Sequence, residues 1–241
     1  MADQLYLSLW FPNFRFEALP AAMTSVLRQF ALISGKENQR VTASTVYPLG
    51  FSESPVYQRI FVNDKRAAET RDTEDAIIEN AVAEATEQLH DDMAYEFEMR
   101  WNLWTPDISP TASSEAQLDS LWRLEPRTVR IIGFGPHFDA SAYEQNGHIR
   151  IDFGLDTPWV LDTLEDDRLA DDRNSAGDYD EDDPQLRHDK ETTKRIQQNI
   201  EMLLAFTLSV EKNCGISSRL LWTESGEPLA EKLIARLQRL N

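Results

Sequence analysis

Residues 93–104 read MAYEFEMRWNLW, the most regular pattern in the chain. Apolar side chains occupy every second position and alternate with mostly polar ones. Alternation with a period of two is typical of a β-strand that buries one face. The pattern therefore predicts a strand that ends at Thr105-Pro106, because proline cannot donate to a sheet ladder. The buried positions are expected to be Met93, Tyr95, Phe97, Met99, Trp101 and Leu103.

The sequence before this segment predicts five further elements. Residues 5–11 alternate in the same way and predict a strand. Residues 18–30 place apolar side chains at helical spacing, as do residues 72–89. Between these helices, residues 40–47 and 55–62 are rich in β-branched and aromatic side chains, which favours two strands. The predicted order over residues 5–104 is therefore β-α-β-β-α-β.

This order is that of the split β-α-β, or ferredoxin-like, arrangement. In that arrangement both helices lie on one side of the sheet, because each makes a right-handed crossover between parallel strands. The prediction rests on element order alone. It requires the strands at 5–11 and 93–104 to lie side by side.

The second half of the chain resembles the first half without its opening strand. Its predicted elements are a helix at 114–123, strands at 128–134 and 148–155, a helix at 190–213, a strand at 218–223 and a helix at 227–240. We therefore predict an α+β protein of two ferredoxin-like modules in tandem, at 1–106 and 113–241. The second module is incomplete and carries an acidic insertion at about 162–189.

The acidic insertion contains a weak calcium-like string, because Asp178, Asp180, Asp182 and Asp189 take loop positions 1, 3, 5 and 12. Position 6, which needs glycine for a sharp turn, is Asp183, and Pro184 follows. A solvated flexible loop is therefore the preferred interpretation, and no metal is predicted.

Composition excludes several classes of protein. The chain has 241 residues and a formal net charge of −18. Nucleic acids and anionic membranes reward Lys and Arg, so neither is an expected partner. A single cysteine, Cys214, excludes an intramolecular disulfide. The start of the chain has no basic segment of a signal peptide, and the longest apolar stretch is too short to span a bilayer. A cytoplasmic location is therefore expected.

No catalytic motif stands out. The four histidines share no metal-binding spacing, and the glycines form no dinucleotide fingerprint. Cys214 precedes Gly215 at the predicted end of a helix, where the negative end of the helix dipole disfavours a thiolate. No cofactor is predicted, and an enzymatic role is not favoured.

The open side of the predicted sheet supplies the candidate binding residues. If the odd positions of 5–11 and 93–104 face the helices, the even positions face outward. The register of 55–62 leaves two choices, one of which adds Arg59. His137 follows a strand end. The candidate ligand-binding residues are Tyr6, Trp10, Arg59, Glu96, Arg100 and His137.

Two functions remain open at this level. The first is a non-enzymatic interaction protein that works through its sheet face or as a homo-oligomer, since Trp, Tyr and Arg are favoured anchors of protein interfaces. The second is a small-molecule-binding or enzymatic α+β barrel, with a ligand cavity between two sheets.

Overall fold

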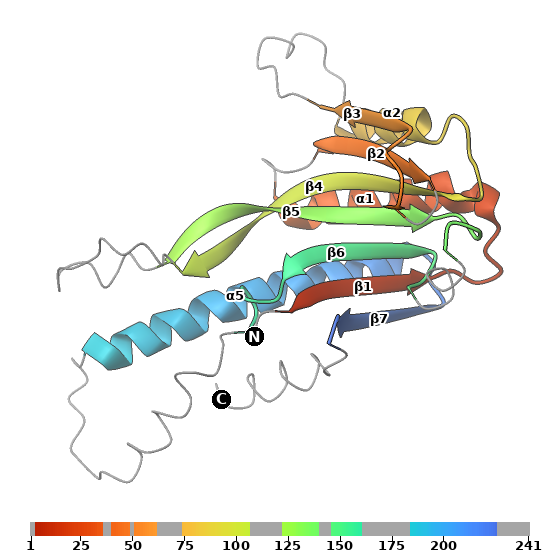
Figure 1. Ribbon diagram of the computed structural model, residues 1–241. Coiled ribbons are helices and arrows are strands. Elements are labelled where there is room, and N and C mark those ends of the chain that lie inside the picture. The colour runs from red at the N-terminus through yellow and green to blue at the C-terminus, as the bar shows by residue number, and fades with distance from the viewer. Residues whose placement is uncertain are drawn as a thin grey trace.

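A computed structural model describes residues 3–35, 40–48, 51–61, 74–106, 122–139, 146–160 and 184–225 (Figure 1). All strands in these residues join one seven-stranded sheet, which is antiparallel at every pairing and has the order β3-β2-β4-β5-β6-β1-β7. The strands are β1 (Gln4–Trp10), β2 (Ala43–Pro48), β3 (Tyr57–Ile60), β4 (Met93–Pro106), β5 (Trp122–Phe134), β6 (Ile149–Leu155) and β7 (Ser218–Thr223). The helices are α1 (Leu19–Ser34), α2 (Glu74–Ala85) and α5 (Pro184–Asn213), and a short 3-10 turn, Phe16–Ala18, leads into α1.

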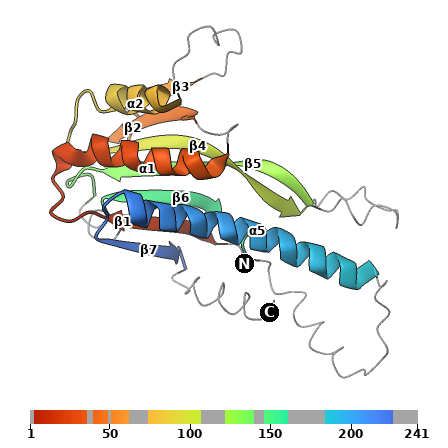
Figure 2. The same ribbon diagram turned by 180° about the vertical axis from the view of Figure 1, so that it is seen from behind.

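The three helices cover one face of the sheet. In Figure 1 the sheet lies in front of α1 and α5, and in the reverse view of Figure 2 these helices lie in front of the sheet. Helix α1 packs between α5 and α2. We call the face beneath the helices the covered face and the opposite one the open face.

The main core lies on the covered face, and β4 supplies its largest side chains. Tyr95, Phe97, Met99, Trp101 and Leu103 are fully buried, whereas Met93 at the start of the strand is only partly buried. The alternation of residues 93–104 is thus confirmed as a strand with one buried side. The Trp101 ring lies 5.2 Å from that of Phe153, 5.4 Å from Phe30 and 5.8 Å from Trp159, measured between centroids.

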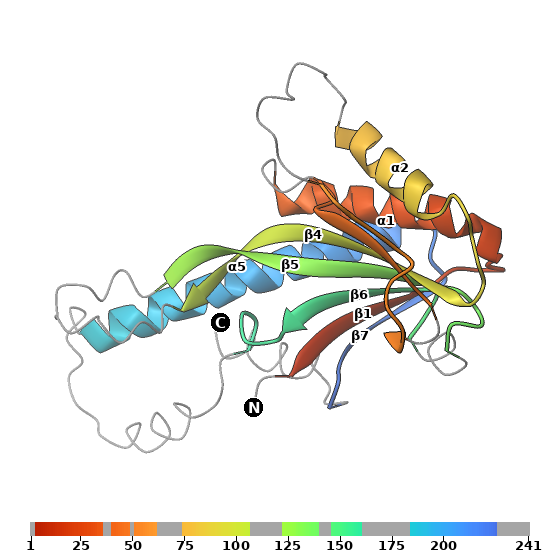
Figure 3. The same cartoon turned by 45° about the horizontal axis from the view of Figure 1, so that its top comes forward.

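Helix α5 runs along the β4–β5 hairpin, which twists strongly (Figure 3). Near its middle, the Asn199 side chain accepts a hydrogen bond from Trp104 N (2.9 Å) and donates to Trp104 O (2.8 Å) at the edge of β4. Towards its start, α5 places Arg195 over the Trp104 ring, at 3.7 Å from the centroid. Helix α5 thereby covers the edge of β4 in the part of the strand that does not pair with β2.

The predicted neighbours 5–11 and 93–104 do not lie side by side, because β5 and β6 separate β1 from β4. Strand β4 pairs with β5, the next strand in the chain, and every pair of described strands is antiparallel, so the parallel crossovers expected from element order do not occur between them. Strand β1 instead lies between β6 and β7. The α+β class and the common side of the helices are confirmed, whereas two tandem ferredoxin-like modules are not.

Two predicted boundaries differ most from the structure. Strand β5 begins at Trp122 and not at 128, so the end of the helix predicted at 114–123 is strand. Helix α5 begins at Pro184 and not at 190, so the last part of the acidic segment predicted as a flexible loop is helical. Proline suits a first helical turn, where its missing N–H costs no hydrogen bond. Gly215 follows α5 with φ +63°, as the predicted helix cap requires.

Some predicted features lie outside the described residues. These include most of the helix at 114–123, the helix at 227–240, and Asp178, Asp180 and Asp182 of the calcium-like string. Asp189 lies within α5.

Candidate functional site on the open face

Strand register determines which side chains share the open face. Opposite residues in an antiparallel pair point to the same side, so Tyr6 shares a face with Trp222 and Asp152, and Ser8 shares it with Leu220 and Arg150. Extended across the sheet, the register places three arginines and three acidic residues on this face. They are Arg100, Arg130, Arg150, Glu96, Glu98 and Asp152.

An aromatic row crosses four strands of the open face, and we define it as Trp222, Tyr6, Arg150 and Phe134. The rings of Trp222 and Tyr6 lie 4.6 Å apart between centroids. The Arg150 guanidinium lies 5.2 Å from the centroid of the Tyr6 ring and 5.1 Å from that of Phe134, within the range of cation–π contacts. Trp222 Nε1 donates to Ser8 Oγ at 3.0 Å, which fixes the indole at the β7 end of the row.

Arg150 occupies an unusual environment for an arginine. Burial lowers the pKa of its guanidinium, and the nearby Tyr6, Asp152 and Glu96 oppose this effect. Its Nε atom is buried and has no hydrogen-bond partner among the described residues. Buried polar atoms are normally paired, since leaving one unpaired costs about 1–3 kcal/mol. The aromatic row therefore retains a cationic centre with unused hydrogen-bonding capacity.

Glu96 lies on the same face at 7% exposure. Burial raises the pKa of its carboxyl group, and the positive charge of Arg130 partly opposes the shift. Burial also raises the pKa of the Tyr6 hydroxyl, with a further contribution from the negative charge of Asp152. The centre of the open face thus combines charged groups of both signs with little access to water.

A small apolar cluster borders the aromatic row. It consists of Ala94, Ile132, Phe134 and Phe138, with Tyr47 packed against it. Phe51, from the residues after β2, adds an edge-to-face contact with Phe138 at 4.8 Å. The path after β5 requires glycine at 135, because a Cβ there would lie 2.2 Å from Asp91 O. Phe51 and Phe138 therefore pack against Phe134 at the β5 end of the aromatic row, and Phe134 is fully buried.

The structure brings together some of the candidate residues predicted from sequence. Tyr6, Glu96, Trp10 and Arg100 all lie on the open face, with Tyr6 and Glu96 both beside Arg150. Their role in binding stays a prediction.

Two candidates lie elsewhere. Arg59 is on the covered side of β3, where it forms an ion pair with Glu84 of α2, and its neighbours Gln58 and Ile60 take the open face. His137 follows β5, and its Nδ1 lies 3.0 Å from Asp91 Oδ2 in an exposed pair. Neither residue joins the aromatic row.

Sequence reasoning missed Arg150, Trp222 and Arg130. Residues 148–155, predicted as a strand, alternate apolar and polar side chains in the sequence, and this pattern makes Arg150 a polar, outward position. The predicted separate modules placed β6 and β7 in a different sheet from β1, so Arg150 was not expected near Tyr6. Periodicity can identify the outward side of each strand. Which strands lie beside it can be known only from the order of strands in the sheet.

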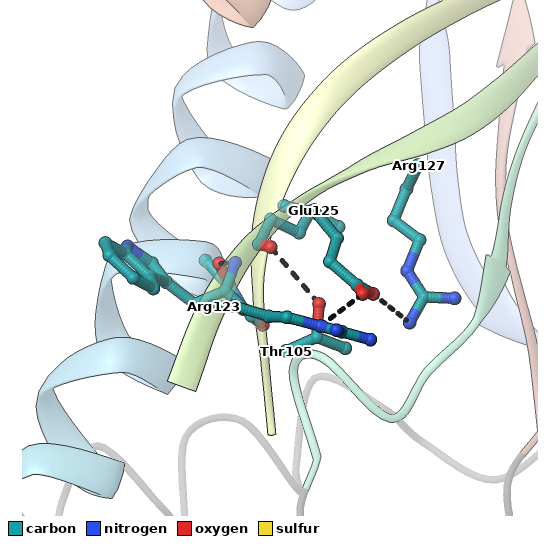
Figure 4. A network of polar contacts seen from close by, with 7 residues as sticks. Thr105, Arg123, Glu125 and Arg127 are labelled. Atoms are coloured by element: carbon teal, nitrogen blue, oxygen red, sulfur yellow. Dashed lines mark hydrogen bonds and ion pairs between the residues drawn. The ribbon is translucent and has the colours of Figure 1, made fainter. Parts of the chain in front are cut away.

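A second polar network lies on the distal part of the β4–β5 hairpin (Figure 4). Glu125 Oε1 lies 2.5 Å from Arg123 Nε, and Glu125 Oε2 lies 3.6 Å from an Arg127 nitrogen. Both arginine side chains are about half exposed, at 59% and 45%. Exposed ion pairs contribute about 0–1 kcal/mol, so this network stabilises the hairpin weakly.

The described residues hold no group of three or more His, Cys, Asp or Glu side chains suited to a metal ion. They also hold no helix long and apolar enough to cross a membrane. All their strands belong to one sheet, so this part of the chain does not by itself enclose a cavity between two sheets.

No family model, curated protein or solved structure matches this chain.

Proposed function

We propose that this protein is a non-enzymatic interaction protein that pairs with a second copy of itself through the open face. The observation that carries the proposal is the aromatic row, which places Trp222, Tyr6 and Arg150 together on a sheet face that no described helix covers. Trp, Tyr and Arg are the residues that most often anchor protein interfaces.

Charge supports a second copy as the partner. The chain as a whole carries a net charge of −18, so two copies repel each other over most of their surface. The three arginines and three acidic residues of the open face cancel, which makes this face a region of low repulsion. A two-fold interface brings the same surface from both subunits together, and a face with both signs of charge can complement itself.

The open face also has the extent and the apolar content that pairing needs. Seven strands at about 4.8 Å spacing span roughly 30 Å, on the scale of an interface of about 800 Å² per partner. Leu220 of β7 and Ile60 of β3 are 51% and 68% exposed on this face. Face-to-face pairing would also supply the second sheet that the small-molecule or enzymatic alternative needs.

Two leucines provide a matched test of the proposal. Leu220 is 51% exposed on the open face, and Leu208 is 57% exposed on α5 in the helix layer. Because both side chains are more than half exposed, a glutamate at either position should leave the fold intact. Leu220→Glu places a charge in the proposed interface, whereas Leu208→Glu does not.

Sedimentation velocity of the full chain over a wide concentration range measures the outcome. We expect a dimer for the unmodified protein, a dissociation constant raised by about tenfold or more for Leu220→Glu, and no change for Leu208→Glu. A monomer at every concentration would overturn the proposal. Equal weakening by the two variants, or weakening by Leu208→Glu alone, would also overturn it.

A further inference from the structure

A pocket of about 290 Å³ lies where the end of α2 meets the β2–β3 hairpin. This volume is just under the roughly 300 Å³ at which typical small-molecule pockets begin. Val46, which is 3% exposed, Ala85, which is 6% exposed, and the partly buried Met93 give the pocket an apolar lining. We call it the α2 pocket. Its strand residues Val46 and Tyr57 lie on the covered side of the sheet, away from the aromatic row.

The charges around the α2 pocket are mainly negative. Glu84 and Glu87 both line it. Helix α2 ends at Ala85 with no basic residue in its last turn, so its terminal carbonyl groups and the negative end of its dipole lie at the pocket. These features favour a positively charged group.

Of the two carboxylates, Glu84 has an ion-pair partner among the described residues and Glu87 does not. Glu84 forms an ion pair with Arg59, and the Tyr57 hydroxyl lies 3.4 Å from Glu84 Oε2. The Glu87 side chain has no ion-pair partner among the described residues. Glu87 is therefore the group that an incoming cation would neutralise.

Tyr57 gives the α2 pocket an aromatic wall. An ammonium group is attracted to the face of such a ring, and more strongly where water is excluded. An apolar lining and an aromatic wall do not favour a hydrated metal ion, because hard cations prefer several oxygen ligands. The lining suits a cation that carries its own apolar body.

Hydrogen bonds hold the turn that forms the pocket rim. The Tyr95 hydroxyl accepts a hydrogen bond from His90 N at 2.7 Å. Thr86 Oγ1 donates to Val82 O at 2.7 Å, which fixes the residue after α2. A rim held in this way needs little ordering when a ligand binds, and that reduces the entropic cost of binding.

We infer that the α2 pocket binds a compact organic cation, with a primary ammonium group beside Glu87 and a small apolar body against Val46, Ala85 and Met93. The inference is independent of the pairing of two copies, since none of these residues belongs to the open-face surface described above.

Three probes of similar shape and different charge test the inference. They are phenethylammonium, the neutral 2-phenylethanol and the anionic phenylacetate, each titrated into the protein by calorimetry at neutral pH. An alkylammonium stays protonated at this pH, as lysine does. We expect phenethylammonium to bind at least about tenfold more tightly than the alcohol, and phenylacetate to bind least.

Two glutamate variants locate the site. Glu87→Gln should weaken phenethylammonium binding by about tenfold, because it removes the carboxylate and keeps the size. Glu201→Gln, at an exposed position of α5 outside the pocket, is the control and should leave binding unchanged. Absence of phenethylammonium binding, equal binding of the three probes, or equal effects of the two variants would overturn the inference. Leu220→Glu should not alter phenethylammonium binding, which keeps this test separate from that of the proposed function.

Discussion

The covered and open faces of the sheet are made by alternate residues of the same strands, yet they differ in chemistry. In β1, Leu5, Leu7 and Leu9 are fully buried beneath the helices, whereas Tyr6 and Trp10 on the other side are only partly buried. The covered face is apolar, but the open face contains desolvated charges. Such charges cost free energy unless they are paired, so an open face selected for stability alone would not need them.

Substitutions of similar size should therefore act differently on the two faces. On the covered face, loss of a side chain should leave a cavity and destabilise the fold. On the open face, neutralising a desolvated charge can be neutral or stabilising, because the charge itself opposes folding. Stability measurements on the two sides of β4 can test this contrast.

Trp101→Ala should give the largest effect. The indole is fully buried and contacts the rings of Phe30, Phe153 and Trp159. Truncation of a buried tryptophan costs about 3–5 kcal/mol. In a chain of this size that lowers Tm by roughly 10 °C, at about 2–4 °C per kcal/mol. Urea unfolding followed by circular dichroism measures the loss, and a loss below about 1 kcal/mol would contradict the assignment of Trp101 to the core.

Asn199→Ala should have a smaller effect on the same side of the molecule. The Asn199 side chain is 1% exposed and makes two hydrogen bonds to the backbone of Trp104 and a third, at 2.8 Å, to Pro158 O. Its removal leaves buried backbone groups unpaired, at a cost of about 1–3 kcal/mol.

Hydrogen exchange identifies the cause of that loss. The Trp104 amide, which donates to Asn199, should exchange faster in Asn199→Ala. Gln197→Ala is the matched control, because Gln197 lies on the exposed side of α5 and bonds only to Glu201 among the described residues. If Gln197→Ala destabilises the protein as much as Asn199→Ala, the buried hydrogen bonds of Asn199 are not the cause.

Sequence periodicity predicted most elements of the fold. Strand β7 was predicted with its observed bounds, and the alternation of residues 93–104 identified the buried side of β4. These features are local, because a period of two or 3.6 residues depends on which side of one element is buried. Helix α5 extends further towards its N-terminus than predicted. The prediction missed the first turns because their residues are mostly charged or polar and show no apolar stripe.

The arrangement of the strands was not predictable in the same way. The order β-α-β-β-α-β is compatible with parallel crossovers and also with the antiparallel sheet that occurs here. The choice depends on the long-range pairing of β1 with β6 and β7, about 150 and 210 residues away, for which no local pattern in one sequence carries a signal. The candidate site was therefore predicted in part: Tyr6 and Glu96 by alternation, but Arg150 and Trp222 only by the structure.

Glu96→Gln should give the smallest effect and one of opposite sign. Burial raises the pKa of the Glu96 carboxyl group in the folded protein above its ordinary value of 4.5. Below that ordinary value the carboxyl is protonated in both the folded and the unfolded chain, so its ionisation contributes nothing to the free energy of unfolding. As the pH rises through the interval between the two pKa values, the unfolded chain loses the proton first, and the unmodified protein loses stability.

Glutamine does not ionise, so the difference in Tm between Glu96→Gln and the unmodified protein should increase with pH across this interval and level off above the pKa of the folded protein. The slope with pH is the informative quantity, since any effect of the amide on packing is the same at every pH. Glu98→Gln, on the same face of β4 but less buried, is the control for replacing a carboxylate by an amide on this face. A difference in Tm that is flat would show that the charges of Arg130 and Arg150 fully offset the burial of Glu96, and one that falls with rising pH would show that they stabilise it as a carboxylate. The contrast between an apolar covered face and a costly charged open face would then fail at its central residue.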